Sequence, residues 1–209
     1  GAGPAGIFTA LELKRKGFAG KIAIAEKGAA IENRACPKVK TQKCVDCKPY
    51  CHITTGFSGA GAFSDGKLSL SCEVGGDFPD LVGAAKAQAL IDYTDRIYLE
   101  FGADTHVEGV EKKDEVAQIR KRAIAAGLKL VDCPIRHLGT EKAQEIYFAI
   151  EKKLEDYGVD LLFGCECVNV VIENGVCTGA VLKDKTGERA VSAEKVIVAT
   201  HFPFINRRG

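Results

Sequence analysis

The chain begins with a glycine-rich turn whose spacing suits a phosphate group. Residues Gly1-Ala2-Gly3-Pro4-Ala5-Gly6 follow the pattern G-x-G-x-x-G, a helix-like stretch continues to Arg15, and the apolar run 21–26 ends on Glu26. In a dinucleotide-binding unit the first glycine allows a tight turn, the second lets backbone approach a pyrophosphate, and the third lets the helix pack closely. The terminal acid accepts hydrogen bonds from ribose hydroxyls. The pattern therefore predicts a nucleotide-binding turn, with a plain glycine-rich loop before a helix as the alternative.

Four cysteines form a second group with possible chemistry. Cys36, Cys44, Cys47 and Cys51 have the spacing C-x7-C-x2-C-x3-C, and His52 follows directly. Four thiolates so close in sequence can surround zinc or an iron–sulfur cluster, although the spacing matches no ferredoxin or zinc-finger pattern. Redox-active or regulatory thiols and purely structural thiols are the alternatives. The other five of the nine cysteines are interpreted as small buried hydrophobes.

Composition restricts the class of protein and its partners. The chain has 209 residues, of which 46% are hydrophobic and 27% charged, so one or two soluble α/β domains are expected. The 29 basic and 28 acidic residues leave a net charge of +1, so we expect no nucleic-acid partner. No apolar run approaches the roughly 20 residues of a membrane span. The cytoplasm is therefore the default location.

Elements that could position these groups follow along the chain. Helical spacing of apolar residues predicts helices over 81–101, 114–126 and 140–157. Other apolar runs predict strands, at 128–133, 159–163, 168–172, 176–182, 190–193 and 195–199. The step Asn174-Gly175 predicts a hairpin turn, and the continuous run 195–199 predicts a strand of a parallel sheet.

The expected fold class is α/β, a Rossmann-like nucleotide-binding fold with an inserted helical and loop region and a small β meander. We expect it to lack its first strand, because the glycine turn begins at residue 1 and the chain contains no methionine. The expected division is 1–80 for the first part of the nucleotide-binding domain, 81–139 for the inserted helical region, and 140–209 for the helix, meander and returning strand. The segment 28–79 is too long for a mere connection, so it is interpreted as functional.

Three stretches together resemble the glutathione-reductase-like FAD flavoproteins. They are the glycine turn, the loop Thr55-Gly-Phe-Ser-Gly-Ala-Gly-Ala-Phe-Ser-Asp-Gly-Lys67, and the final run Glu194-Lys-Val-Ile-Val-Ala-Thr200. Cys36-Pro37 and Asp132-Cys-Pro-Ile-Arg-His-Leu-Gly-Thr140 are further similar to a group of uncharacterised FAD-dependent dehydrogenases related to geranylgeranyl reductase-type enzymes. Nearly the whole chain takes part in the resemblance.

The resemblance implies FAD as the cofactor. The glycine turn would hold its pyrophosphate at a helix N-terminus, Glu26 its ribose, and the loop around Gly59 would return to the flavin. The residues implied in cofactor binding are Gly1, Ala2, Gly3, Pro4, Ala5, Gly6, Glu26, Lys27, Gly59, Gly61, Ser64, Asp65, Val168, Ala199 and Thr200. For the stretch 64–67, a turn with solvated charges is the alternative.

Two catalytic candidates come from the same resemblance. His137, on a loop before the helix at Thr140, would face the flavin and supply a proton near neutral pH. Lys67 would place a cation near the flavin, where it stabilises the reduced anionic form. The alternative for His137 is a polar loop residue that supports the helix cap.

The resemblance implies an incomplete FAD-dependent oxidoreductase that transfers a hydride to or from an organic small molecule, with NAD(P)H as a possible electron donor. After Thr200 the family has a glycine, whereas this chain has His201. We expect the 209 residues alone to be inactive, because the substrate domain should follow. A cysteine-based metal or redox-thiol module with a vestigial nucleotide site is the alternative function.

Overall fold

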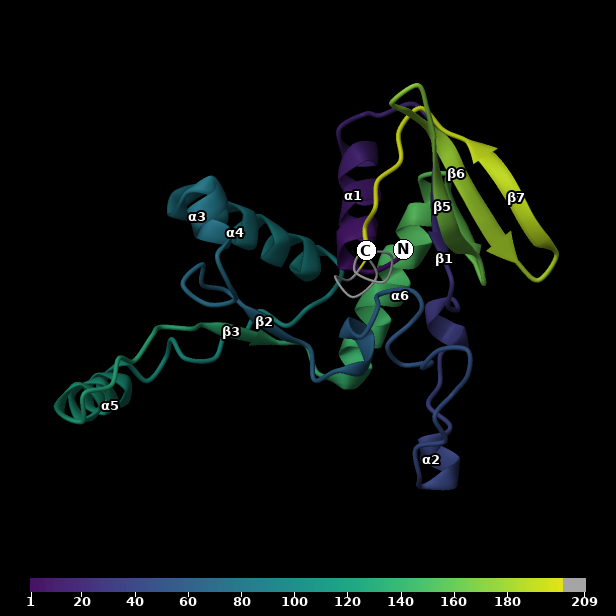
Figure 1. Ribbon diagram of the computed structural model, residues 1–209. Coiled ribbons are helices and arrows are strands. Elements are labelled where there is room, and N and C mark those ends of the chain that lie inside the picture. Colours follow the sequence, from purple (N-terminus) through teal and green to yellow (C-terminus); the bar gives the residue numbers. More distant parts are fainter. Residues whose placement is uncertain (201–209) are drawn as a thin grey trace. The chain divides into compact units, whose positions relative to one another are not determined.

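A computed structural model describes residues 1–200 of the chain, and the position of His201 lies outside them. The fold divides into two compact units (Figure 1). The first unit is formed by Gly1–Phe63 together with the chain from Tyr147 onward, and the second by Ser64–Ile146. The expected division at residues 80 and 139 stays a prediction. Among residues 1–200, every helix is too short or too polar to cross a bilayer.

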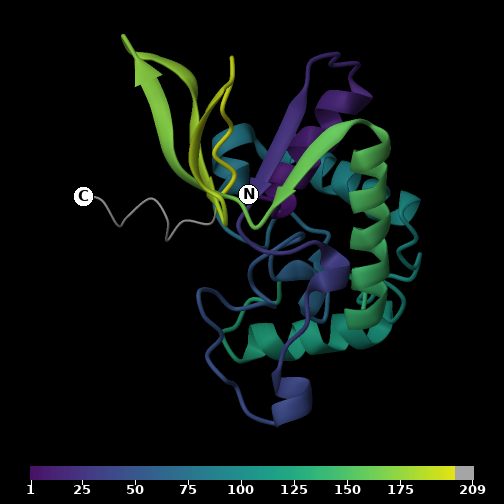
Figure 2. The same cartoon turned by 90° about the vertical axis from the view of Figure 1, so that its right-hand side faces the viewer.

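The first unit is built on a helix and two parallel strands. Helix α1, Pro4–Arg15, begins with proline at a position where its missing N–H costs nothing, and Lys14 and Arg15 lie at the negative end of its dipole. Strand β1, Ile22–Glu26, pairs in parallel with β4, Val159–Phe163, in a register that places Glu26 opposite Phe163 (Figure 2). Ile7 and Leu11 of α1 are fully buried, so the helix contributes an apolar face to this unit.

Helix α6, Thr140–Asp156, confirms the predicted helix and its apolar face. Within the first unit it buries Tyr147, Ile150 and Leu154, which recur at helical spacing. It also buries Glu151, whose carboxylate accepts a hydrogen bond from the backbone N–H of Ile31 at 3.1 Å. Ile31 begins the short 3-10 helix η1, Ile31–Asn33.

An antiparallel meander confirms the predicted hairpin. It consists of β5, Glu166–Glu173, β6, Val176–Asp184, and β7, Gly187–Ser192, in the order β5-β6-β7 (Figure 1). Asn174 and Gly175 both have positive φ, at 51° and 78°, as the favoured two-residue hairpin turn requires.

The strand predicted over 195–199 is wrong. These residues pair with no strand among residues 1–200, and the side chains of Ile197 and Val198 are 57% and 62% exposed. An apolar run becomes a strand only when a neighbouring strand takes up its backbone N–H and C=O groups. The apolar pattern alone does not supply that neighbour.

A long connection fills the rest of the first unit. It contains η1, the short helix α2, Lys38–Thr41, and the 3-10 helix η2, Gly61–Phe63. Figure 2 shows α2 at the far end of a loop that extends away from the β1–β4 pair. The four clustered cysteines belong to this loop.

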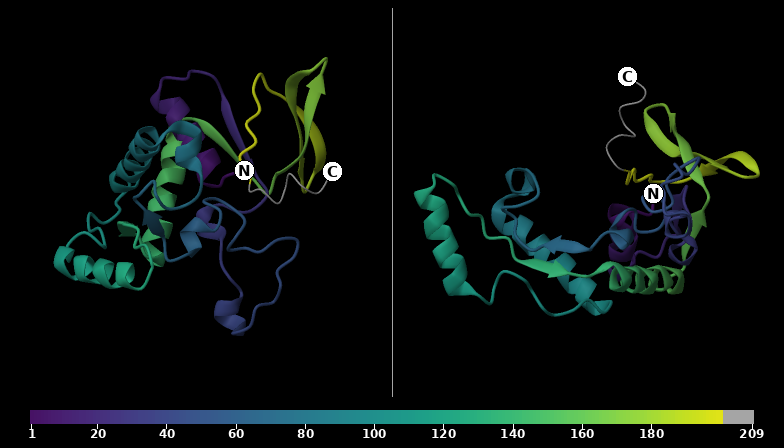
Figure 3. Two further views of the ribbon diagram at one scale, coloured as in Figure 1. Left: turned by 60° about the vertical axis from the view of Figure 1, so that its left-hand side comes forward. Right: turned by 90° about the horizontal axis from the view of Figure 1, so that it is seen from below.

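The second unit contains helices and one short pair of strands. Strand β2, Lys67–Ser69, pairs antiparallel with β3, Ile135–His137, and the helices are α3, Phe78–Val82, α4, Ala84–Glu100, and α5, Lys113–Ala125 (Figure 3). The strand predicted over 128–133 is wrong, because the chain reaches its partner only after Pro134, where 135–137 meet β2.

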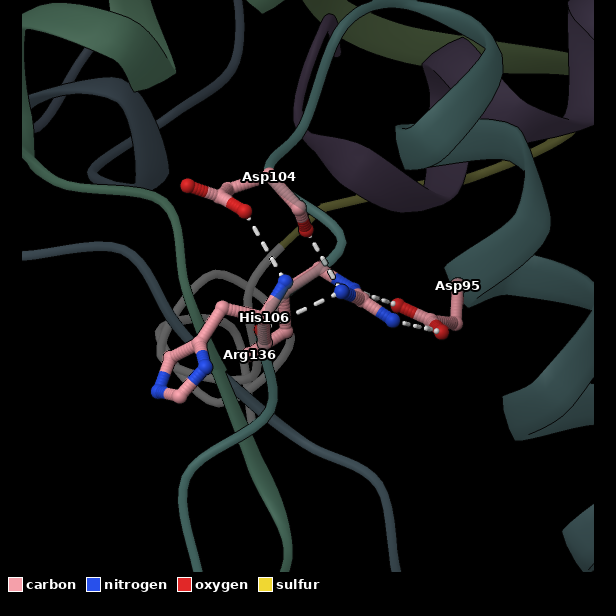
Figure 4. Close-up of polar contacts among 4 residues, drawn as sticks. All are labelled: Asp95, Asp104, His106 and Arg136. Carbon is pink, nitrogen blue, oxygen red and sulfur yellow. Dashed lines mark hydrogen bonds and ion pairs between the residues drawn. The ribbon is translucent and has the colours of Figure 1, made fainter.

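Arg136 ties β3 to α4 (Figure 4). Its side chain is buried, and Nε and Nη2 donate to the two carboxylate oxygens of Asp95 at 2.5 and 2.8 Å. Nη1 donates to the backbone carbonyls of Asp104 and His106. Because successive side chains of a strand point to opposite faces, this contact directs the neighbouring His137 to the other, exposed face.

Glu151 makes the stability of the first unit depend on pH. Burial, with the nearby charges of Glu32 and Glu155, raises the pKa of its carboxyl to about 7, from 4.5. The folded pKa is the higher one, so the folded state holds this proton more tightly. The contribution of Glu151 to the free energy of unfolding is fully present below about pH 4.5 and is lost as pH rises to about 7.

We predict that Glu151→Gln flattens this pH dependence. Glutamine still accepts the N–H of Ile31 but carries no charge that must be buried, so the variant should exceed the wild type in stability at pH 8 by up to about 3 kcal/mol. Urea denaturation at pH 5 and pH 8 measures the difference. Glu141→Gln, at an exposed position in the first turn of the same helix, is the control, because Glu141 does not contribute to the raised pKa of Glu151. An unchanged pH slope in Glu151→Gln would contradict the prediction.

Candidate functional site

The N-terminus of α1 is open on the side where a phosphate group would bind. Gly3 caps the helix with φ −75° and ψ 175°, and no side chain of residues 1–200 forms a capping hydrogen bond there. A Cβ added at Gly3 would meet no atom of these residues within 4 Å. Free N–H groups and the positive end of the helix dipole favour an anion at such a position.

The other two glycines of the turn lie in close packing, which only Gly6 strictly requires to be glycine. A Cβ at Gly6 would lie 2.1 Å from the carbonyl oxygen of Gly1, so a side chain would force the turn away from the helix. A Cβ at Gly1 would lie 3.3 Å from the carbonyl oxygen of Ala199. The structure therefore brings Ala199 beside the glycine turn, although the segment that carries it is not a strand.

Glu26 lies beside the glycine turn and also fixes its position through hydrogen bonds. Its carboxylate, 7% exposed, accepts the backbone N–H of Ala2 at 2.8 Å and that of Gly28 at 2.9 Å. The predicted contact was with ribose hydroxyls, and the structural contact with backbone was not expected. A carboxylate has about four acceptor positions, so these two bonds leave capacity for a ribose hydroxyl. Lys27, the next residue, is half-buried.

The glycine-rich loop after residue 55 packs on the turn. Ser58 donates its backbone N–H to the carbonyl of Ala2 at 2.7 Å, and Gly59, at φ +59°, lies against Gly3. A Cβ at Gly61 would come 3.1 Å from the hydroxyl of Tyr147. Of the residues implied in cofactor binding, the described contacts bring together one set around the turn, Gly1, Ala2, Gly3, Pro4, Gly6, Glu26, Gly59 and Ala199.

Other implied residues lie elsewhere in the structure. Val168 lies half-buried on β5, and Thr200 is the last described residue. Ser64 and Asp65 belong to the second unit. Their assignment to the cofactor stays a prediction.

Arg34 is a candidate that the sequence reasoning missed. Its side chain is 5% exposed, and its guanidinium lies over the ring of Phe63 at 4.4 Å. Nε donates to the carbonyl of His52 at 3.0 Å, and Nη1 donates to the carbonyl of Phe57 and to the hydroxyl of Ser58. Desolvation lowers its pKa to about 10, which leaves it charged at neutral pH. No spacing marks Arg34 in the sequence, because its partners lie about twenty residues further along the chain.

The structure does not gather the four clustered cysteines into a metal site. All four are free thiols, and among residues 1–200 no group of three or more His, Cys, Asp or Glu side chains could hold a metal ion. Zinc or an iron–sulfur cluster stays a prediction. At Cys51, hydrogen bonds from the backbone of Ile53 and the side chain of Thr54 hold the pKa of the thiol below the usual value. This favours a reactive thiol at Cys51.

The two catalytic candidates meet in the second unit. Lys67 on β2 and His137 on β3 are directly opposite in the antiparallel register, so His137 is on a strand and not on the predicted loop. Lys67 Nζ contacts Asp65 Oδ2 at 2.8 Å. The hydrogen bond from Lys67, with smaller effects of the Lys67 and His137 charges, lowers the pKa of the Asp65 carboxyl. The three exposed side chains combine a carboxylate, a cation and an imidazole that can exchange a proton.

A cavity of about 380 Å³ lies in the same unit. Strand β2 and helices α3 and α4 line it, mainly with apolar side chains such as Leu70, Phe78 and Leu90. The lining residues that carry polar groups are Lys67, Ser69, Thr94, Asp95 and Tyr98. A concave apolar surface with few polar groups is the usual form of a small-molecule site.

Comparison with solved structures finds partial matches to flavoenzymes. An L-amino acid deaminase from Proteus vulgaris matches with a TM-score of 0.45 and 16% identity, over 92% of this chain and 44% of that chain. A glycine oxidase from Bacillus cereus matches with a TM-score of 0.48 and 17% identity, over 93% of this chain and 53% of that chain. The chain spans about half the length of these proteins.

Comparison of sequences gives the family. An uncharacterized protein of Clostridium beijerinckii is 42% identical over 69 residues, which are 33% of this chain and 13% of that protein. Residues 87–202, more than half of the chain, match the FAD binding domain family. The matched range includes most of the α4 helix, α6, the strands β4 to β7 and Ala199. The Rossmann-like α/β fold expected from the glycine turn agrees with this match, and the chain belongs to the FAD binding domain family.

Proposed function

We propose that the whole protein containing this chain is an FAD-dependent oxidoreductase acting on a small organic molecule. The observation that carries the proposal is the open N-terminus of α1, with Gly3 unobstructed and Ala199 and Gly59 packed beside it, in a chain of the FAD binding domain family. The relation to geranylgeranyl reductase-type enzymes and the use of NAD(P)H stay predictions.

The residues present fit the cofactor. The unobstructed backbone at Gly3 can accept a pyrophosphate, and the close packing at Gly6 keeps the first turn of α1 in position for it. Glu26 retains acceptor capacity for the ribose, and the backbone of Gly59 lies next to the turn. FAD, when bound, supplies the hydride acceptor or donor. The chain itself would bind and orient it.

In the second unit, the cavity beside β2 is the proposed site for the organic molecule. Its apolar lining from α3 and α4 would bind the hydrocarbon part, and Lys67 would attract a negatively charged or carbonyl group. His137 is opposite Lys67 on β3, although it is not among the described residues that line the cavity, and it would hold or release the proton that accompanies hydride transfer.

Gly3→Val tests the cofactor site. The position has an ordinary φ of −75°, and no atom in the described part of the chain lies within 4 Å of the added Cβ, so the variant should fold normally. The valine would occupy the approach path of the pyrophosphate, and the whole protein should therefore lose its flavin. Visible absorbance gives flavin content, and circular dichroism verifies folding. A folded Gly3→Val protein with full flavin content would refute the proposed function, and absence of flavin from the wild type would favour the cysteine-based alternative.

Glu26→Gln should affect both folding and cofactor retention. The amide keeps one acceptor oxygen, but its NH2 group would face one of the backbone N–H donors of Ala2 and Gly28. Leaving that donor unpaired should lower the free energy of unfolding by about 1–3 kcal/mol and weaken FAD retention. Chemical denaturation and flavin release measure the two effects. Equal stability of the variant and the wild type would show that these bonds do not hold the turn.

His137→Gln tests proton transfer in the second unit. The substitution keeps a polar side chain but removes the titratable imidazole, so turnover should fall roughly 100-fold while flavin content stays unchanged. His106→Gln, at another exposed histidine of this unit, is the control. Steady-state turnover with an artificial electron acceptor, recorded across pH, is the measurement. A pH profile in His137→Gln identical to that of the control would remove His137 from the mechanism.

A further inference from the structure

The cavity of the second unit is bounded by two elements that run past each other in opposite directions, β2 and α4. Gln88, near the start of α4, donates its side-chain amide to the carbonyl of Leu70 at 3.0 Å. Asp95, in the middle of α4, binds Arg136, which is opposite Leu68 in the β2–β3 register. The start of α4 therefore lies beside the end of β2, and the middle of α4 lies further back along the strand.

This alignment gives the cavity an apolar end and a polar end. The lining side chains near the start of α4 are apolar, and they are Leu70, Phe78, Leu90 and Ile91. Further along the helix the lining consists of Thr94, Asp95 and Tyr98. Thr94 Oγ1 donates to the carbonyl of Leu90 at 2.9 Å, so its oxygen still has lone pairs for a ligand. A cavity graded in this way suits a molecule with a hydrocarbon body and one polar head.

The charged groups of the lining are already paired. Both carboxylate oxygens of Asp95 accept hydrogen bonds from Arg136, at 2.5 and 2.8 Å, and the two side chains are only 14% and 5% exposed (Figure 4). Lys67 contacts the carboxylate of Asp65 at 2.8 Å. A ligand head with its own charge would lose hydration and find no unpaired counter-charge among the described lining residues.

We infer that the cavity binds an aliphatic molecule whose single polar head is uncharged, a hydroxyl or a carbonyl, in preference to a carboxylate or an amine of similar length. A hydroxyl can donate to the oxygens of Thr94 or Asp95. A carbonyl can accept from Lys67, whose ammonium has donors left after its contact with Asp65.

As a statement about the substrate, this inference rests on the proposed function. An alcohol and the carbonyl compound made from it differ by one hydride and one proton. Oxidation of the alcohol breaks its C–H bond and its O–H bond, passes the hydride to the flavin and releases the proton. The two uncharged heads are therefore the two sides of one hydride transfer.

Equilibrium dialysis of the whole protein under anaerobic conditions tests the inference. Octanol, methyl hexyl ketone, octanoate and octylamine are the probes, because they are similar in length and differ in the charge of the head. The two uncharged probes should bind roughly tenfold more tightly than the two charged ones. Equal or tighter binding of octanoate or octylamine would overturn the inference, and so would the absence of binding by all four probes.

Leu90→Gln tests whether the hydrocarbon body lies at the apolar end. The amide should weaken octanol binding several-fold, because it replaces apolar contact surface. Leu90 is itself 41% exposed, so the variant should fold, which circular dichroism verifies. Leu81→Gln, at an exposed leucine of α3 outside the lining, is the matched control and should bind octanol as the wild type does. Unchanged octanol affinity in Leu90→Gln would overturn the inference.

Asp95→Asn tests whether paired charges cause the preference. The amide keeps an acceptor for Arg136 but removes the negative charge, so the arginine becomes a cation without a full counter-charge beside the polar end. Octanoate should then bind several-fold more tightly than to the wild type, whereas octanol affinity should change little. Asp80→Asn, at an exposed aspartate of α3, should change neither. Unchanged octanoate affinity in folded Asp95→Asn would contradict the inference, and Leu90→Gln decides it if Asp95→Asn does not fold.

Visible absorbance of the dialysed samples separates this inference from the proposed function. A protein that contains flavin but prefers octanoate refutes the inference and leaves the proposed function standing. A protein that contains no flavin but binds octanol through Leu90 refutes the proposed function and leaves the binding preference standing.

Discussion

The position of the glycine turn depends on the Glu26 carboxylate. One oxygen accepts the N–H of Ala2 and the other that of Gly28, so a single buried side chain joins the start of the chain to the segment that leaves β1. Both donors are backbone groups that would otherwise be buried without partners. The open face at Gly3 exists because this contact, and the close packing of Gly6 on Gly1, hold the turn against its helix.

Arg34 fixes the next layer around the turn. Its guanidinium donates to carbonyls of the segment 52–58 and so holds the loop that places Gly59 beside Gly3. The buried side chains of Glu26 and Arg34 therefore position neighbouring parts of the glycine turn and its surroundings. Each charge faces mainly backbone groups and not the other charge. This arrangement positions loops that have no strand or helix of their own, which explains how an irregular segment can contribute to a defined site.

In the second unit, too, buried charged side chains hold irregular segments in place, here those of Arg136 and Asp95. Arg136 and Asp95 form a two-point ion pair, and further bonds to the carbonyls of Asp104 and His106 anchor the connection after α4. The pair fixes which face of β3 is buried. His137 is therefore exposed opposite Lys67, and the geometry of these two residues results from a structural contact on the reverse side of the strand.

The sequence alone determined the glycine turn, the helices close to 114–126 and 140–157, and the hairpin at Asn174-Gly175, because their signals are local in the chain. The helix expected over 81–101 is correct only from Ala84 to Glu100, because Gly83, at φ +85°, separates it from α3. The tertiary structure decided where pairing partners lie. It left 195–199 unpaired, moved the strand expected at 128–133 to 135–137, and placed His137 on it. It also left the four cysteines apart and gave Glu26 and Arg34 their backbone partners. These features depend on contacts between residues that are far apart in the chain. Residue type and local spacing do not show which distant residues come into contact.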